Sequence, residues 1–132
     1  MLKYDKLYIG GQWIEPAIKE LLEIRSPHDQ SLVGRAAQAS KVDVDLAVSA
    51  AKEAFVSGPW PQMEPKERQE VIARFNDLHA ARSAEIAALV TAENGSPISF
   101  TSFLQPALFE QTNAYLRAAA SLGWEETLPS GV

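Results

Sequence analysis

The sequence pattern changes near residue 40, and this change constrains the fold more than any single motif does. Before residue 40, short runs of β-favouring residues alternate with turns rich in glycine and proline. After it, apolar residues recur at helical spacing. The sequence therefore predicts a mixed α/β chain. We expect short β-hairpins in residues 1–39, three to four packed helices in residues 40–123 and an extended tail in residues 124–132.

Two hairpins are expected in the first 39 residues. Residues 7–9 and 12–14 are β-favouring runs separated by Gly10-Gly11, a pair that tolerates the positive φ angles of a tight hairpin turn. A second pair of runs covers residues 21–25 and 31–36, with a turn-rich segment between them.

Helix boundaries are also readable in the remaining chain. Ser40 and Asp43 have the spacing of a capping box, and Pro65 suits the first turn of a helix. A bend is expected near Arg82, with Ser83 as a cap, and residues 94–97 should stop the helix. Pro106 either begins the main body of the last helix or kinks it. The apolar positions expected to face a core are Val44, Val48, Ala51, Phe55, Ile72, Phe75, Leu78, Ile86, Leu89 and Val90.

Composition excludes several classes of function. The chain has 132 residues, 46% of them hydrophobic, and a formal net charge of −5, so neither disorder nor a broad nucleic-acid surface is favoured. It contains no cysteine, which removes disulfides, thiolate metal sites and thiol nucleophiles. No apolar run approaches the length of a membrane span. We expect a cytoplasmic protein with neither nucleic-acid nor membrane partners.

No catalytic constellation can be assembled from the residues alone. His28 and His79 have no partners at metal-ligand spacing, so surface or packing roles are favoured over ligation. The seven glycines form neither a dinucleotide-binding nor a phosphate-loop pattern. Trp13, Trp60 and Trp124 are interpreted as burial anchors, because no basic groove accompanies them. We therefore assign no catalytic and no cofactor-binding residue to this chain.

The order of the motifs carries more information than any one of them. The series comprises residues 7–13, Ser26-Pro27, residues 43–48 and 50–55, Gly58-Pro59-Trp60, residues 65–68 and residues 93–97. This series resembles the amino-terminal part of the NAD(P)-dependent aldehyde dehydrogenases. Ser26 and Ser96 depart from the residues that many members carry, asparagine and lysine respectively.

The resemblance implies that the chain corresponds to about the first quarter of the family's length. The parent enzyme would oxidise an aldehyde to a carboxylic acid with NAD or NADP. Its nucleophilic cysteine, general-base glutamate and cofactor-binding glycine turn would all lie downstream. The chain alone is then expected to be inactive and to bind no cofactor tightly, with the remainder of the enzyme, or a second copy, as its partner. The alternative is a free-standing interaction or regulatory module that dimerises or binds full-length subunits.

The resemblance also implies two groups of site residues. Ala107, Leu108 and Gln111 would face the substrate tunnel, although ordinary helix packing accounts for them equally well. The carbonyls of Ile24 and Arg25 and the carboxylate of Glu93 would hold a monovalent cation, because oxygen ligands suit such a hard ion. The alternative for Glu93 is simply a position near a helix end.

Overall fold

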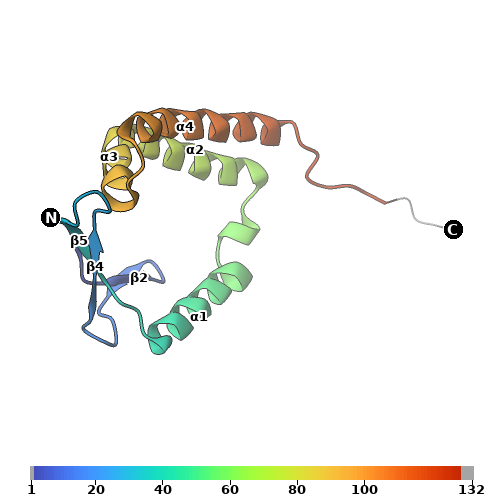
Figure 1. The fold of residues 1–132 in the computed structure, drawn as a ribbon. Helices are drawn as coiled ribbons and strands as arrows, with labels where there is room; N and C mark the ends of the chain where they lie inside the picture. Colours follow the sequence, from blue (N-terminus) through green and yellow to red (C-terminus); the bar gives the residue numbers. More distant parts are fainter. Residues whose placement is uncertain (1, 129–132) are drawn as a thin grey trace.

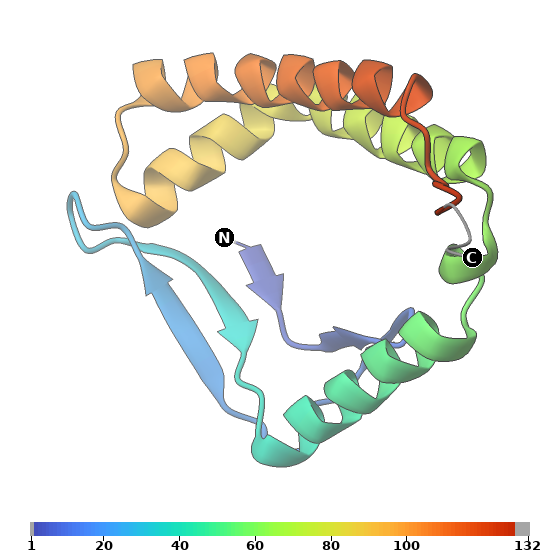
Figure 2. The same cartoon turned by 90° about the vertical axis from the view of Figure 1, so that its right-hand side faces the viewer.

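The computed structural model describes residues 2–128, and its elements follow one another around an open ring (Figures 1 and 2). The strands are β1 (Leu2–Tyr4), β2 (Leu7–Ile9), β3 (Gln12–Ile14), β4 (Leu21–Arg25) and β5 (Leu32–Ala37). The helices are α1 (Lys41–Ser57), the short 3-10 helix η1 (Trp60–Gln62), α2 (Pro65–Ala81), α3 (Ser83–Asn94) and α4 (Ile98–Ala120). The predicted mixed α/β class, with short strands followed by helices, is confirmed.

Both predicted hairpins are present. In the first, β2 and β3 pair antiparallel with Leu7 opposite Ile14, and the turn residues Gly10 and Gly11 have φ angles of 60° and 81°. These positive angles are accessible to glycine without steric cost. In the second hairpin, β4 pairs antiparallel with β5.

A third strand, which the sequence pattern did not reveal, joins the second hairpin. Strand β1 pairs parallel with β5, with Leu2 opposite Gly34, and the strand order is β1-β5-β4. The two partners lie about 30 positions apart in the chain, whereas the hairpin signals are local.

The helix boundaries follow local chemistry with two exceptions. The Ser40–Asp43 capping box is formed, and the helix breaks at Arg82 as predicted. Ser83, however, does not cap α3: it is the first helical residue, and Arg82 occupies the N-cap without a side-chain hydrogen bond. Pro106 does not begin α4, because the helix runs through it from Ile98 to Ala120. The extended tail follows as far as residue 128; positions 129–132 of the predicted tail lie outside the described residues.

Helix α4 packs along both α2 and α3 (Figure 1). The buried Asn76 of α2 donates from Nδ2 to the Phe109 carbonyl at 3.1 Å and to Asn113 Oδ1 at 3.0 Å. Between α3 and α4, the hydroxyl oxygens of Thr91 and Thr101 are 2.8 Å apart. Polar contacts therefore contribute much of the specificity of this three-helix layer.

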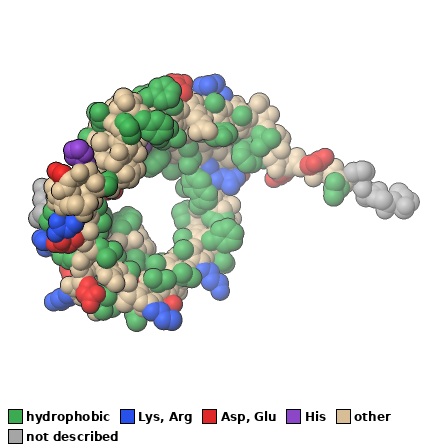
Figure 3. Space-filling view, viewed as in Figure 1, with side chains coloured by type: hydrophobic (Ala, Val, Ile, Leu, Met, Phe, Trp, Pro, Cys, Tyr) green, Lys and Arg blue, Asp and Glu red, His purple; other side chains and the backbone are tan. Residues whose placement is uncertain are grey.

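The expectation of an apolar core was wrong. Among the described residues, Ala87 is the only buried hydrophobic side chain, whereas Val48 is 63% and Phe55 80% exposed. Further exposed members of the predicted core set are Val44, Ile72, Phe75 and Leu78, and the three tryptophans are exposed as well. Apolar spacing identifies the apolar face of a helix, but it does not say which part of a protein lies against that face. The space-filling view is correspondingly hollowed at the centre of the ring (Figure 3).

The strands and the helices meet again where the turn between β4 and β5 contacts the turn between α3 and α4. Gly95, the C-cap of α3, has a φ angle of 77°, and a Cβ atom built on it would lie 2.8 Å from Pro27 Cγ. Two separate constraints therefore require glycine at this position: the left-handed backbone and the close approach of Pro27.

Replacing Gly95 tests this closure. We expect Gly95→Ala to lower the free energy of unfolding by about 1–3 kcal/mol, because alanine is strained in the left-handed region and must also displace Pro27. The measurement is urea unfolding followed by circular dichroism. Gly123→Ala is the matched control, since its Cβ would meet no atom within 4 Å. Equal midpoints for the two variants would contradict the closure.

Candidate functional site

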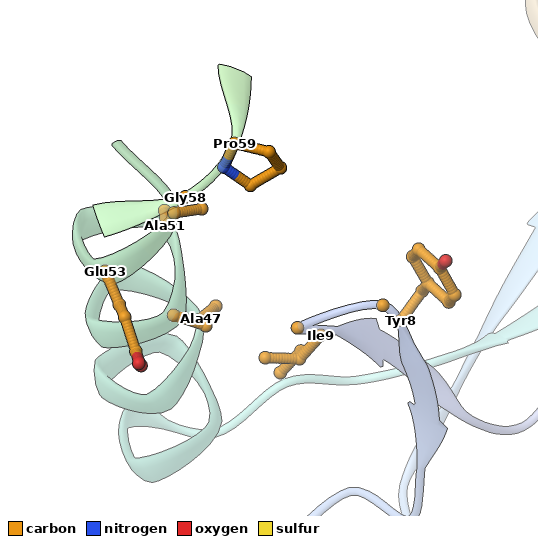
Figure 4. Close-up of a pocket in the computed structure, with 11 residues that line it drawn as sticks. Tyr8, Ile9, Ala47, Ala51, Glu53, Gly58 and Pro59 are labelled. Carbon is orange, nitrogen blue, oxygen red and sulfur yellow. The ribbon is translucent and has the colours of Figure 1, made fainter. Parts of the chain in front are cut away.

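A groove of about 510 Å³ lies between the β2–β3 hairpin and α1 (Figure 4). The helix contributes mostly small side chains, among them Ala47 and Ala51, and Ile9 of the hairpin points toward Ala47 in the close-up. Glu53 is the only ionisable side chain in the groove lining apart from the Tyr8 phenol. The groove thus offers shape and apolar contact but no nucleophile and no acid–base pair.

A buried carboxylate fixes the start of α1. Asp43 is 4% exposed and accepts hydrogen bonds from Ser40 N and Ser40 Oγ, both at 2.8 Å. Its two oxygens also accept from the Ala17 amide, at 3.0 and 3.3 Å, which ties α1 to the segment between β3 and β4. The hydrogen bonds from Ser40, first from its amide and then from its hydroxyl, hold the pKa of Asp43 below its ordinary value despite burial. The carboxylate is therefore ionised at neutral pH.

The amino termini of α1 and α2 each form a reciprocal capping box that includes a carboxylate of the chain. At α2, the Glu67 carboxylate accepts from the Glu64 amide at 2.9 Å and completes a reciprocal capping box. A dinucleotide pyrophosphate needs free amides at a helix start, usually after a glycine turn. Neither of these two helix starts follows a glycine turn, and each carries a reciprocal capping box instead.

The predicted tunnel residues lie together on α4. Ala107, Leu108 and Gln111 are all exposed, while the side chains that α4 buries belong to Thr101 and Gln105. The carbonyl of Leu108 accepts from Thr112 Oγ1 at 3.0 Å, as part of the helix surface. No described element covers these three residues, and their tunnel role stays a prediction.

The predicted cation ligands are brought together only in part. Ile24 and Glu93 line the same small cavity, of about 80 Å³, between the sheet and α3. Arg25, whose main-chain carbonyl is the other predicted ligand, is not in the lining of this cavity. Within the described range, no group of three or more histidine, aspartate or glutamate side chains is placed to hold a metal ion. The cation site also stays a prediction.

The structure adds two links that the sequence pattern did not reveal. One is the bond between Asp43 and Ala17, and the other is the Arg68 guanidinium, which lies 5.7 Å from the centroid of the Trp124 ring. Each joins residues far apart in sequence, so no local spacing could have indicated it. Within residues 2–128, none of the helices is both long enough and apolar enough to span a membrane.

In the described residues, short strands and helices form a ring in which Ala87 is the only buried hydrophobic side chain. The sequence model of the aldehyde dehydrogenase family matches residues 13–131, and the chain belongs to that family.

Individual relatives agree in coverage. The chain is 31% identical to aldehyde dehydrogenase 1 of Tanacetum cinerariifolium over 90% of its own length and 24% of that protein. It is 32% identical to geranial dehydrogenase of Castellaniella defragrans, covering 98% of this chain and 27% of the relative. The chain therefore spans about a quarter of the length of the curated relatives it matches.

The fold is similar to that of solved members of the family. The aldehyde dehydrogenase of Mycobacterium tuberculosis, solved in complex with NAD+, is 37% identical and superimposes with a TM-score of 0.87. The match covers 96% of this chain and 26% of that one. An NAD-dependent aldehyde dehydrogenase from Sinorhizobium meliloti gives a TM-score of 0.85 at 30% identity.

The Asp43 carboxylate predicts a pH dependence. Because its pKa is lowered by folding, its stabilising contribution is present above the unfolded-state pKa and is lost as pH falls through the lower folded-state value. We expect the urea midpoint of the wild-type chain to fall below about pH 4. Asp43→Asn should start with a lower midpoint at pH 7 and lose less of it on acidification.

The control for this series is Asp45→Asn, which removes an exposed carboxylate from the same helix. Its midpoint should follow the wild type across the titration, because exposed ion pairs contribute little. Parallel pH curves for the wild type and Asp43→Asn would contradict the role assigned to Asp43.

Proposed function

We propose that this chain is the amino-terminal framework of an NAD(P)-dependent aldehyde dehydrogenase, an enzyme that oxidises an aldehyde to a carboxylic acid. The observation that carries the proposal is the superposition of 96% of the chain on about a quarter of an enzyme complexed with NAD+. The hollow centre of the ring and its exposed apolar side chains are consistent with a surface that the rest of such an enzyme covers (Figure 3).

In this proposal the chemistry is divided along the chain. The reaction needs a nucleophile to attack the aldehyde and a bound cofactor to accept hydride. This sequence contains no cysteine, and the starts of α1 and α2 carry capping boxes without a glycine turn before them. The nucleophile and the nucleotide site are therefore assigned to the remainder of the enzyme. This chain contributes Ala107, Leu108 and Gln111 to the tunnel wall, and Ile24, Arg25 and Glu93 to a cation site.

A second candidate function uses the same exposed surface. A free-standing module could dimerise, or bind full-length subunits, through side chains such as Phe55 and Phe75, which are 80% and 66% exposed. Apolar surface of this kind favours association whichever protein supplies the partner.

An activity assay tests the first candidate. We expect the purified chain, its mass confirmed, to give no absorbance change at 340 nm above the blank with an aldehyde and either NAD or NADP. The reason is the missing thiol nucleophile. A full-length family member serves as the positive control. Turnover that stays with the intact chain through purification would contradict the proposal.

An association assay separates the two candidates. Light scattering during gel filtration should detect a concentration-dependent mixture if the apolar faces simply lack their covering segment. A single stoichiometric dimer, or a defined complex with a full-length subunit, would instead support the interaction module.

A further inference from the structure

A second pocket, of about 340 Å³, lies where the end of α4 meets the start of α2. Its lining is mainly apolar and includes Trp60, Ile72, Leu116 and Trp124. Three of the lining residues are polar or charged beyond the tyrosine phenol: Arg68, Gln69 and Thr112. An apolar cavity of this size with a few polar groups has the properties of a small-molecule site.

Trp124 is held in place as one wall of this pocket. Its Nε1 donates to the Ala119 carbonyl in the last turn of α4, at 3.3 Å. On the other side, Arg68 lies over its ring at 5.7 Å from the centroid, within the range of a cation–π contact. The extended tail is thereby attached to α2 at the mouth of the pocket.

Arg68 brings a positive charge that the described part of the chain does not neutralise. The ion pairs among residues 2–128 involve Arg25, Arg35, Arg82 and three lysines, and none of them involves Arg68. The Thr112 hydroxyl is already donated to the Leu108 carbonyl. Beside the neutral Gln69 amide, the guanidinium is the only charged group in the pocket lining, and its planar fork suits a carboxylate.

We propose that this pocket binds a small amphipathic carboxylate. Its apolar body would lie against Trp60, Ile72 and Leu116, and its carboxylate would pair with Arg68 beside the Trp124 ring. The site is separate from the α4 residues assigned to the tunnel and uses no aldehyde chemistry, so it goes beyond the proposed function. The charge of Arg68 selects an acid over a neutral molecule of the same shape.

The experiment uses 4-phenylbutyrate as the probe and the indole N–H signals of the ¹⁵N-labelled chain as the readout. Trp60 and Trp124 line the pocket, whereas Trp13 lies on the β2–β3 hairpin and provides an internal reference. We expect saturable shifts of the Trp60 and Trp124 signals with little change at Trp13. The neutral analogue 4-phenylbutan-1-ol should bind at least about tenfold more weakly, a difference of about 1.4 kcal/mol.

Charge variants on one helix complete the test. Arg68→Gln should weaken 4-phenylbutyrate binding at least about tenfold and leave the alcohol unaffected, which corresponds to loss of one charged contact. Arg74→Gln removes the same charge from α2 outside the pocket and should leave both affinities unchanged. Equal binding of acid and alcohol by the wild-type chain would overturn the proposal without any variant, as would shifts of all three indoles together.

Discussion

Buried polar side chains, rather than a hydrophobic core, fix the relative positions of the elements. Asp43, Asn76, Thr101 and Gln105 are buried, whereas Ala87 alone represents the hydrophobic residues in the described range. Asp43 and Asn76 join elements that are not consecutive in the chain, and Thr101 joins the neighbouring helices α3 and α4. Gln105 Oε1 has no hydrogen-bond partner, which is a cost rather than a gain. These hydrogen bonds specify the geometry. Most of the large apolar side chains remain exposed, so their burial contributes little stabilisation within the described structure.

The scarcity of buried apolar side chains accompanies the hollow centre of the ring (Figure 3). Burial of apolar surface is the dominant favourable contribution to folding, and each large side chain left in water forgoes it. Phe55 on α1 and Phe75 on α2 are both more exposed than buried, although their spacing is that of core positions. These apolar helix faces are therefore left uncovered by the described part of the chain. The exposed faces occur in a chain that belongs to the aldehyde dehydrogenase family and spans about a quarter of the length of its curated relatives.

The sequence predicted what is local and missed what is distant. Gly10-Gly11, the Ser40–Asp43 box and the break at Arg82 are set by neighbouring residues, and each was predicted correctly. The pairing of β1 with β5 and the bond from Ala17 to Asp43 depend on elements brought together only by the complete ring. The candidate site divides in the same way: Ile24 and Glu93 line one cavity, and this proximity was expected only from the family resemblance, because no local spacing encodes it.

Reciprocal capping boxes are formed at the starts of α1 and α2. A helix amino terminus binds phosphate because its first amides are free and its dipole favours negative charge. Asp43 and Glu67 place a negative charge in the first turns of α1 and α2 and accept from the N-cap amides, and Asp43 also ties two segments together. Opening either terminus to a nucleotide would remove a cap and, at α1, a link of the ring. The Asp43 and Glu67 carboxylates therefore act as caps at these helix starts, and at α1 the Asp43 carboxylate also links two segments of the ring.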